Sequence, residues 1–501
     1  MVEVAFYGDD FTGSTDALAQ FTRLGFRGIL LVTMPAWDEL QALARQYDVI
    51  GVAGIARSLP PDEQEAEIRP ILQALRDLGP HFVQYKVCST ADSSPTLGSI
   101  GCALEVGRSI FGPAVVPILI AQPDLGRYTV FSHHFAAEAG TTHRLDRQPT
   151  MSSHPTTPMH ESDLRRHLVN QTNLRIGAVH LTSYPDLPAH DTNATYDALI
   201  LDALTDADLQ SIAHTILTPP TTPTFAIGSG GLSRALALAL TSPPPTCDHP
   251  DPTPSAADSK HPKPSTPPSD PPTTLTDQSP TRDRTITPPA DSSRQPATST
   301  SASGLAAVGH PTTRPKNHAM PGRGDRAQVS VAGQVLVVSG SQSPRTAEQI
   351  AHAVASGWHS LPLTYRPAAA PDSSPSVVTE AVRVLKAGAP GVVVHTGEAI
   401  GRAAGQLLGA FSKELAAVVR EVVRTTQVRR VVVAGGDTSG RVLRELGVTA
   451  LEPSPTIPPH LGQGLTLCTA ISTDPMLRGI QFLLKGGQLG DPNLFARLRH
   501  A

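Results

Sequence analysis

Short runs of branched aliphatic residues alternate with longer amphipathic stretches from Val2 to about Leu240. This alternation is typical of a parallel sheet whose faces are covered by helices. Helical spacing of the apolar residues is clearest over Asp62–Leu78 and Ser162–Gln171. We therefore expect an α/β domain over residues 1–241, with strands at Val2–Tyr7, Gly28–Val32, Val49–Ala53, Phe82–Lys86, Val115–Ala121, Ile176–Leu181, Ala198–Leu201 and Thr224–Ile227.

The same alternation resumes at Val331 and continues to the end of the chain. We expect a second α/β domain over residues 331–501, so the predicted fold has two α/β domains with mostly parallel sheets. Its predicted strands are Val335–Ser339, Gly391–His395 and Val428–Ala434, followed by the runs Leu465–Ile471 and Gly479–Leu484. Its predicted helices are Arg345–Ala355, Ser376–Lys386 and Ile400–Arg424.

Residues 242–330 differ sharply from both domains, because Pro, Ser, Thr and Asp dominate and aromatic or branched aliphatic residues are scarce. Such a segment cannot bury enough apolar surface to offset the entropy lost on ordering. We predict a disordered linker or insertion between the two domains.

Length, net charge and cysteine content limit the classes of protein to which this chain can belong. The 501 residues exceed the roughly 250–300 that one core supports, and a formal charge of −4 lacks the basic excess of a nucleic-acid binder. The four cysteines form no CxxC pair, which argues against a zinc site or a disulfide framework. No export signal or long apolar run is found, so we expect a cytoplasmic protein without membrane contact, and a homo-oligomer is compatible with this composition.

Three acids surround the first predicted turn, where Asp9, Asp10 and Asp16 follow the strand Val2–Tyr7. In parallel α/β sheets ligands bind at the carboxyl ends of the strands, so these carboxylates should face a crevice. Helix capping is the alternative, because Asp and Thr often cap a helix that follows a strand. One or two caps would leave at least one acid unexplained.

A second polar cluster follows the strand Phe82–Lys86 and contains Ser89, Thr90 and Asp92. A lysine beside several hydroxyls suits a polyhydroxylated anion, since the ammonium pairs with a carboxylate while Ser and Thr bond to hydroxyls. Arg57, after the third strand, could add a bidentate clamp on a carboxylate. Ordinary surface solvation is the alternative for each residue taken alone.

A third candidate is the proline-punctuated loop Arg144–Met159, which contains cations and His154. Long ordered loops are often functional, although this one could simply pack over the sheet. A lone histidine without a second ligand at useful spacing is more often a hydrogen-bonded loop residue than a metal ligand.

Three glycine-rich turns follow strands of the second domain: Ser339–Ser343, Gly435–Gly440 and Gly486–Gly490. Glycine lets a backbone approach phosphate closely, and the following helix presents N–H groups. The patterns GxxxxGK[ST] and GxGxxG are absent, so neither a P-loop nor a standard dinucleotide fingerprint is supported. Plain tight turns are the alternative for each one, but together they indicate a nucleotide.

Six strings in order resemble the four-carbon acid sugar kinase family, bacterial kinases of threonate, erythronate, 3-oxo-tetronates and related acids. They are GDDFTGSTD, YKVCSTADSS, HPTTPM with DLRRHL, SGSQSP, GGDTSG and LLKGGQLG. The resemblance covers about residues 2–240 and 331–497, and it is strongest to the branch that acts on 3-oxo-isoapionate. It implies that the first domain binds the sugar acid, the second binds ATP, and the reaction occurs between them.

By this resemblance the substrate pocket maps onto Asp9, Asp10, Asp16, Arg57, Lys86, Ser89, Thr90 and Asp92. The ATP contacts map onto Ser339, Ser341, Gly435, Gly436, Asp437, Thr438, Ser439 and Gly487. Two departures from the family are the long linker and the stretch Ile457–Gly464, which replaces a proline-glycine-proline loop.

The expected reaction is ATP-dependent phosphorylation of a sugar-acid hydroxyl, with Asp10 or Asp16 as the general base. Mg²⁺ is expected with ATP, chiefly through phosphates and water, and the sequence selects no protein ligand for it. A sugar-acid dehydrogenase is the competing enzyme, although the dinucleotide fingerprint is missing. A non-catalytic sugar-acid sensor is the competing binding protein.

Deleting residues Pro244–Arg314 should leave turnover and melting temperature nearly unchanged, because disordered segments contribute little packing and loop entropy grows slowly with length. Thermal unfolding and steady-state kinetics of the deletion variant test this expectation. A large loss of either would show that the segment is structural.

Overall fold

The computed structural model describes residues 2–154, 156–186, 195–215, 217, 223–241, 333–363, 376–396, 404–454, 462 and 464–500. The predicted linker 242–330 and most of the stretch Ile457–Gly464 lie outside the described residues. The described residues of both domains belong to one compact unit.

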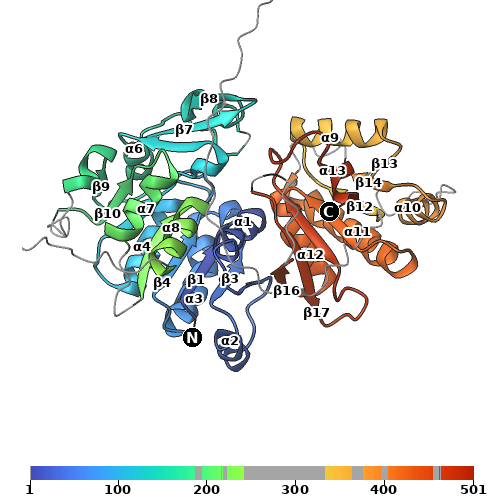
Figure 1. Cartoon of the computed structure of the whole chain (residues 1–501), viewed down its shortest axis with the longest axis horizontal. Coiled ribbons are helices and arrows are strands. Elements are labelled where there is room, and N and C mark those ends of the chain that lie inside the picture. The colour runs from blue at the N-terminus through green and yellow to red at the C-terminus, as the bar shows by residue number, and fades with distance from the viewer. Residues whose placement is uncertain are drawn as a thin grey trace, which may run out of the picture. The chain divides into compact units, whose positions relative to one another are not determined.

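The first domain contains a parallel set of strands and a separate three-stranded sheet (Figure 1). Its strands are β1 (Val4–Gly8), β2 (Gly28–Leu31), β3 (Val49–Ala53), β4 (Phe82–Lys86), β5 (Val116–Leu119), β6 (Arg127–Val130), β7 (His133–Glu138), β8 (Thr141–Arg144), β9 (Ile176–Val179), β10 (Ala198–Leu201) and β11 (Thr224–Gly228). Its α-helices are α1 (Phe11–Thr22), α2 (Trp37–Ala44), α3 (Pro61–Asp77), α4 (Ile100–Phe111), α5 (Pro149–Ser152), α6 (Leu164–Val169), α7 (Asp206–Thr215) and α8 (Gly230–Thr241).

The second domain has the same alternation of strands and helices. Its strands are β12 (Val335–Ser339), β13 (His359–Pro362), β14 (Gly391–His395), β15 (Arg430–Ala434), β16 (Val448–Pro453), β17 (Leu467–Ser472) and β18 (Gln481–Lys485). Its α-helices are α9 (Pro344–Ala355), α10 (Val377–Lys386), α11 (Ala404–Thr425), α12 (Gly436–Leu446) and α13 (Leu494–Arg497).

The predicted α/β class is confirmed, and the strands of the two domains join into one sheet of 15 strands. The order is β13-β14-β12-β15-β18-β17-β16-β2-β3-β1-β4-β11-β5-β10-β9. Most neighbouring pairs are parallel, whereas β16 pairs antiparallel with β2, Leu451 opposite Leu30. Strand β16 had no counterpart among the predicted strands, because its polar positions interrupt the apolar run.

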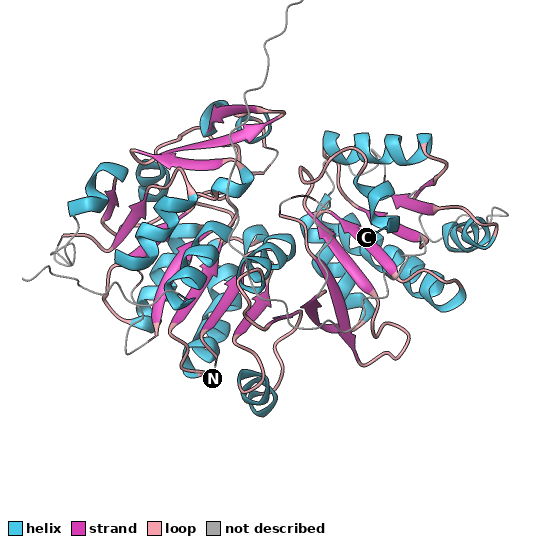
Figure 2. Ribbon diagram, in the orientation of Figure 1, coloured by secondary structure: helices cyan, strands magenta, loops and turns pink. Residues whose placement is uncertain are grey.

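Helices cover both faces of the strands in each domain (Figure 2). Alternate residues of β1 enter two different cores: Val4 and Phe6 pack in the cluster that includes α1 and α8, while Ala5 and Tyr7 pack in the cluster that includes α3 and α4. Because both faces of the sheet are buried, the strands read as continuous apolar runs, which is what made them predictable.

The region Arg127–Arg144 forms the antiparallel sheet β6-β7-β8, which lay outside the predicted strands. The predicted loop Arg144–Met159 contains the short helix α5, which the Gln148 side chain caps by accepting from the Met151 N–H at 2.6 Å. Pro149 at the first helical position is compatible with that start. Among the described residues, no helix is long and apolar enough to span a bilayer.

Candidate active site

The candidate residues of the first domain meet because parallel strands end in register. Gly8 of β1 pairs with Ala53 of β3 and with Lys86 of β4, and Lys86 pairs in turn with Gly228 of β11. The residues that follow these strands therefore lie at one edge of the sheet. Asp9, Arg57 and Lys86, which the sequence placed after three different strands, are brought together in this way.

Arg57 lies between two carboxylates at this edge. Its Nε and Nη2 donate to Asp9 at 3.2 and 2.6 Å, and Nη2 also donates to Asp10 Oδ1 at 3.0 Å. Only 19% of the Arg57 side chain is exposed, so these are strong charge-assisted bonds. The predicted substrate clamp is thus already paired with two protein acids in this structure.

Asp10 is both a helix cap and a member of this cluster. Its carboxylate accepts from the Gly13 N–H at 2.9 Å, which caps α1, and from Thr12 Oγ1 at 2.6 Å. Burial raises the pKa of Asp10, but the charges of Arg57 and then Lys86 oppose burial and hold it below the ordinary value. Helix capping and a place in the charged cluster, which were alternatives from the sequence alone, are therefore both true of Asp10.

Asp9 differs from Asp10 in the direction of its pKa shift. Burial raises the pKa of Asp9 to about 6, although Arg57 opposes the rise, and the neighbouring charge of Asp10 adds to it. Two adjacent carboxylates that share one guanidinium are thus driven apart in pKa. Both carboxylates are therefore mainly ionised at neutral pH, and Asp9 is the one that takes up a proton first as the pH falls toward 6.

Lys86 lies against the turn that begins α1. It is 2% exposed, and its Nζ donates to the Val87 carbonyl at 2.9 Å. A Cβ added at Gly13 would lie 2.5 Å from Asp10 Oδ1 and 2.9 Å from Lys86 Nζ. Glycine at this position therefore permits the close approach of the carboxylate and the ammonium to the turn.

Asp16 occupies a different environment from Asp10. Its carboxylate accepts from Gln122 Nε2 at 3.0 Å and from Gln20 Nε2 at 3.4 Å. A Cβ added at Gly230, the first residue of α8, would lie 2.4 Å from Asp16 Oδ2. Asp10 is the N-cap of α1 with an extended backbone, whereas Asp16 lies inside the helix, and the two carboxylates share no hydrogen-bond partner among the described residues.

The segment after β4 is held by two other parts of the domain. The Ser89 carbonyl accepts from His134 Nε2 of β7 at 2.8 Å, and Thr90 Oγ1 lies 3.0 Å from Cys88 Sγ. The Asp92 carboxylate accepts from the Thr157 hydroxyl.

His154, from the predicted loop, completes this contact. Its Nδ1 accepts from the Thr157 N–H at 3.2 Å and lies 3.8 Å from Asp92 Oδ1. The loop region therefore positions Asp92. Among the described residues, no group of three or more His, Cys, Asp or Glu side chains could hold a metal ion.

In the second domain, as in the first, adjacent parallel strands end in register. Ser339 of β12 pairs with Ala434 of β15, and Ala434 pairs with Lys485 of β18. The three predicted glycine-rich turns therefore start from one row across three adjacent parallel strands. This convergence is what backbone recognition of a phosphate chain needs.

Hydroxyl groups join two of these turns and brace them internally. Ser343 Oγ donates to the Gly487 carbonyl at 2.8 Å, and Ser339 Oγ accepts from the Ser341 N–H at 3.3 Å. A Cβ added at Gly340 would lie 2.2 Å from Thr438 Oγ1, so only glycine fits there. Ser439 Oγ donates to the Gly435 carbonyl at 2.7 Å.

The first residues of α12 lie beside the acids of the first domain. A Cβ added at Gly436 would lie 3.3 Å from Asp10 Oδ2, and Ser58 Oγ donates to Asp437 Oδ1 at 2.8 Å. Gly435, the N-cap of α12, provides no side-chain cap. An uncapped helix N-terminus that favours an anion thus lies next to a buried carboxylate.

Two residues that contact the candidate site were not among the predicted site residues. Lys485 ends β18 with its ammonium under the Gly486–Gly487 turn, and His134 holds Ser89. A lysine directly before two glycines was a usable signal for Lys485, whereas His134 stands in a sheet that the sequence pattern did not reveal.

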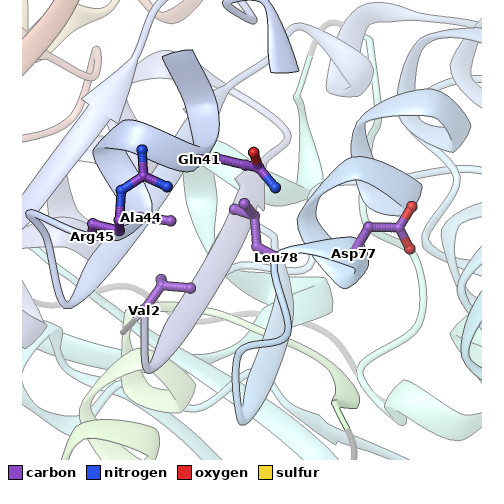
Figure 3. Close-up of a pocket in the computed structure, with 6 residues that line it drawn as sticks. All are labelled: Val2, Gln41, Ala44, Arg45, Asp77 and Leu78. Carbon is purple, nitrogen blue, oxygen red and sulfur yellow. The ribbon is translucent and has the colours of Figure 1, made fainter. Parts of the chain in front are cut away.

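A surface hollow of about 350 Å³ lies away from this site (Figure 3). It is lined by Val2, Gln41, Ala44, Arg45, Asp77 and Leu78. Val2 precedes β1 and Leu78 follows α3, so the hollow is at the opposite edge of the sheet from Asp9 and Asp10. We assign it no role in the chemistry.

Two family models match separate parts of the chain. A family model described as "Sugar-binding N-terminal domain" matches residues 4–236, and one described as "Nucleotide-binding C-terminal domain" matches residues 336–495. A 3-oxo-isoapionate kinase of Paraburkholderia graminis is 33% identical over 99% of this chain and 94% of its own length.

Two further comparisons extend over nearly the whole chain. A 3-oxo-tetronate kinase of Methylobacterium radiotolerans is 29% identical over 98% of this chain and 96% of its own. A solved structure of a protein from Salmonella typhimurium LT2 superposes with a TM-score of 0.61 at 21% identity, covering 99% of this chain and 98% of its own. That structure supports the fold alone.

The fold, the site and these relatives define a two-domain α/β kinase of sugar acids. The chain belongs to the four-carbon acid sugar kinase family, as the six strings indicated.

His134 generates a testable pH dependence, because burial lowers its pKa to about 4, the Ser89 carbonyl opposes the shift and Arg127 adds to it. The unfolded chain takes up this proton near pH 6.5, so the stabilisation is complete above about pH 6.5 and is lost as pH falls toward 4. We expect the free energy of unfolding to drop by about 2 kcal/mol from this residue between pH 7.5 and pH 5.

His134→Gln should therefore show a smaller loss of stability on acidification than the parent, measured by chemical denaturation at both pH values. His352→Gln is the matched control, since His352 is exposed and should keep the full loss. His167, whose pKa burial also lowers to about 4, remains in both variants. An unchanged pH dependence in His134→Gln would contradict the assignment of a buried neutral imidazole.

Proposed function

We propose that the protein transfers the γ-phosphoryl group of ATP to a hydroxyl of a four-carbon acid sugar or a 3-oxo acid such as 3-oxo-tetronate or 3-oxo-isoapionate. The observation that carries the proposal is the proximity of Asp10 to the uncapped N-terminus of α12. A phosphate at that terminus would lie next to a carboxylate able to accept a proton from an attacking hydroxyl.

The proposal gives each domain one substrate. Residues 1–241 would bind the sugar acid, with Asp9, Arg57, Lys86, Ser89, Thr90 and Asp92 around it. Residues 331–501 would bind ATP through Ser339, Ser341, Gly435, Gly436, Asp437, Thr438, Ser439 and Gly487. The converging turns at the ends of β12, β15 and β18 support this assignment.

In the proposed reaction the substrate hydroxyl oxygen forms a bond to the γ-phosphorus while the bond from that phosphorus to the β-phosphate oxygen breaks, which releases ADP. The hydroxyl proton passes to Asp10. When bound, Mg²⁺ neutralises the phosphate charge, and phosphates and water would supply most of its ligands.

Asp10 suits the role of proton acceptor, because Arg57 and Lys86 keep it ionised and Gly13 and Thr12 fix its direction. A carboxylate held in one orientation beside the phosphate site also contributes positioning. Asp16, whose carboxylate bonds to Gln122 and Gln20, is better suited to hold α1 to the segment that follows β5.

Lys86, Ser89 and Asp92 lie on the segment that His134 and Thr157 hold in place. The ammonium of Lys86 would attract the carboxylate of the substrate, and the hydroxyls would bond to its hydroxyl groups. The relative named 3-oxo-isoapionate kinase supports 3-oxo-isoapionate among the candidate substrates. A cytoplasmic location is part of the proposal, supported by the free thiols of Cys88, Cys102 and Cys468.

A coupled assay of ADP release tests the proposed function across a panel of four- and five-carbon sugar acids. We expect ADP release that requires both ATP and one acid of the panel. A dehydrogenase would instead change the absorbance of a nicotinamide cofactor, and a sensor would bind the acid without consuming ATP. Either result would replace the kinase proposal.

Asp10→Asn should lower turnover by roughly 10²- to 10⁴-fold, because asparagine still caps α1 but cannot accept the proton. Asp16→Asn is the matched comparison on the same helix and should stay within a few-fold of the parent. Both variants should keep ATP affinity, measured by calorimetry, and melting temperature.

The pair of variants separates the alternatives. A large loss in Asp16→Asn with little loss in Asp10→Asn would assign the base to Asp16. If both variants keep the parent turnover, the acids are structural and no carboxylate of α1 accepts the proton.

A further inference from the structure

Lys485, the last residue of β18, is fully buried beneath the glycine-rich turn that follows it. Its Nζ donates to Thr346 Oγ1 at 2.9 Å, to the Gly486 carbonyl at 2.9 Å and to the Gly487 carbonyl at 3.0 Å. An ammonium has three donors, and all three are used here. The group therefore has a fixed position rather than a mobile one.

All three acceptors of Lys485 are neutral. Among the described residues no carboxylate lies within ion-pair distance of its ammonium, and the charged group that influences it most is Arg345, a second cation. Arg345 is itself paired with Glu348 at 2.8 Å. A buried ammonium without an anion is costly, so in its charged form Lys485 is an uncompensated positive charge beneath this turn.

The direction of the two carbonyls determines the direction of the neighbouring amides. In a trans peptide the C=O and N–H point in opposite directions. Because the carbonyls of Gly486 and Gly487 point toward Lys485, the N–H groups of Gly487 and Gln488 point away from it. Neither N–H has an acceptor among the hydrogen bonds of the described residues.

We propose that Lys485 is a positioning residue for the phosphates of the bound nucleotide. Its ammonium turns the carbonyls of the Gly486–Gly487 turn inward, so that two free N–H groups face a phosphate, and its charge favours the anion. This inference rests on the proposed function, because it takes a nucleoside triphosphate as the ligand of these turns. It adds a residue that acts through the turn without touching the ligand.

Proton uptake by Lys485 on ATP binding offers a second measurement that tests the proposal. Burial lowers the pKa of Lys485 to about 7, with Arg345 adding to the shift. Arg345, which lies on α9 and pairs with Glu348, is the charged group that acts on it, while the adjacent ends of β12 and β15, Ser339 and Ala434, are uncharged. A bound phosphate would favour the charged ammonium, so binding should take up a proton above pH 7.

Calorimetry of ATP binding to the full chain tests the proposal with Lys485→Met, which keeps an unbranched side chain one atom shorter and removes the charge. We expect the Kd for ATP to rise at least about tenfold, with the Kd for the sugar acid unchanged. Lys413→Met, at an exposed lysine of α11, is the matched control and should bind ATP like the parent.

The parent should also bind ATP more weakly as pH rises from 7.5 to 9, by up to about tenfold per pH unit, with proton uptake measured in buffers of different ionisation enthalpy. The terminal phosphate is already ionised in this range, since its pKa is about 6. Lys485→Met should lose this slope. If the variant does not fold, the pH dependence of ATP binding by the parent still tests whether Lys485 acts on the phosphates.

Two outcomes would overturn the inference while the proposed function stands: a folded Lys485→Met that binds ATP as tightly as the parent, or a parent whose ATP affinity shows no pH dependence and no proton uptake. If the parent binds no ATP at all, the proposed function fails and the inference fails with it. The parent titration therefore distinguishes the two failures.

Discussion

In-register pairing of parallel strands is the constraint on which the rest of this structure depends. In the first domain it sets Gly8, Ala53 and Lys86 in one row, and in the second it sets Ser339, Ala434 and Lys485 in another. Each strand contributes a few residues just beyond its end, so groups that are distant in sequence meet without needing long-range contacts of their own. A slip of one residue in any of these strands would turn its side chains to the opposite face of the sheet.

The cations at the two rows differ in their partners. At the first row, Arg57 is balanced by Asp9 and Asp10, so the cluster holds cations and anions in fixed positions. Beneath the second row, Lys485 bonds only to neutral acceptors. In the proposed function a phosphate chain would supply the missing negative charge at the second row, and the sugar acid would use the oriented cations and hydrogen-bond donors of the first.

The sequence was sufficient wherever a polar residue directly follows a buried apolar run. This holds for Asp9, Asp10, Lys86 and the three glycine-rich turns. A residue at the end of a predicted strand, or directly after it, must lie at the edge of the sheet where that strand ends. Asp16 was harder, since its direction depends on rotation along α1. Strand β16 and the β6-β8 sheet were not predicted, because their alternating or interrupted patterns resemble loops until a partner strand is known.

Two helix N-termini must be held close together for this site to work, and ordinary packing does this. Helix α1 begins after Asp10 and α12 begins at Gly436, and Phe11 lies against α12, where a Cβ added at Gly440 would come within 2.5 Å of its ring. The Arg444 guanidinium lies 5.4 Å from the centre of the same ring. The residue that follows the candidate base is thus the one that fixes α12 beside it. Close packing at Phe11 links the position of the Asp10 carboxylate to the position of the Gly435–Gly436 turn, so in the proposed reaction the geometry would depend on an apolar contact one residue away from the base.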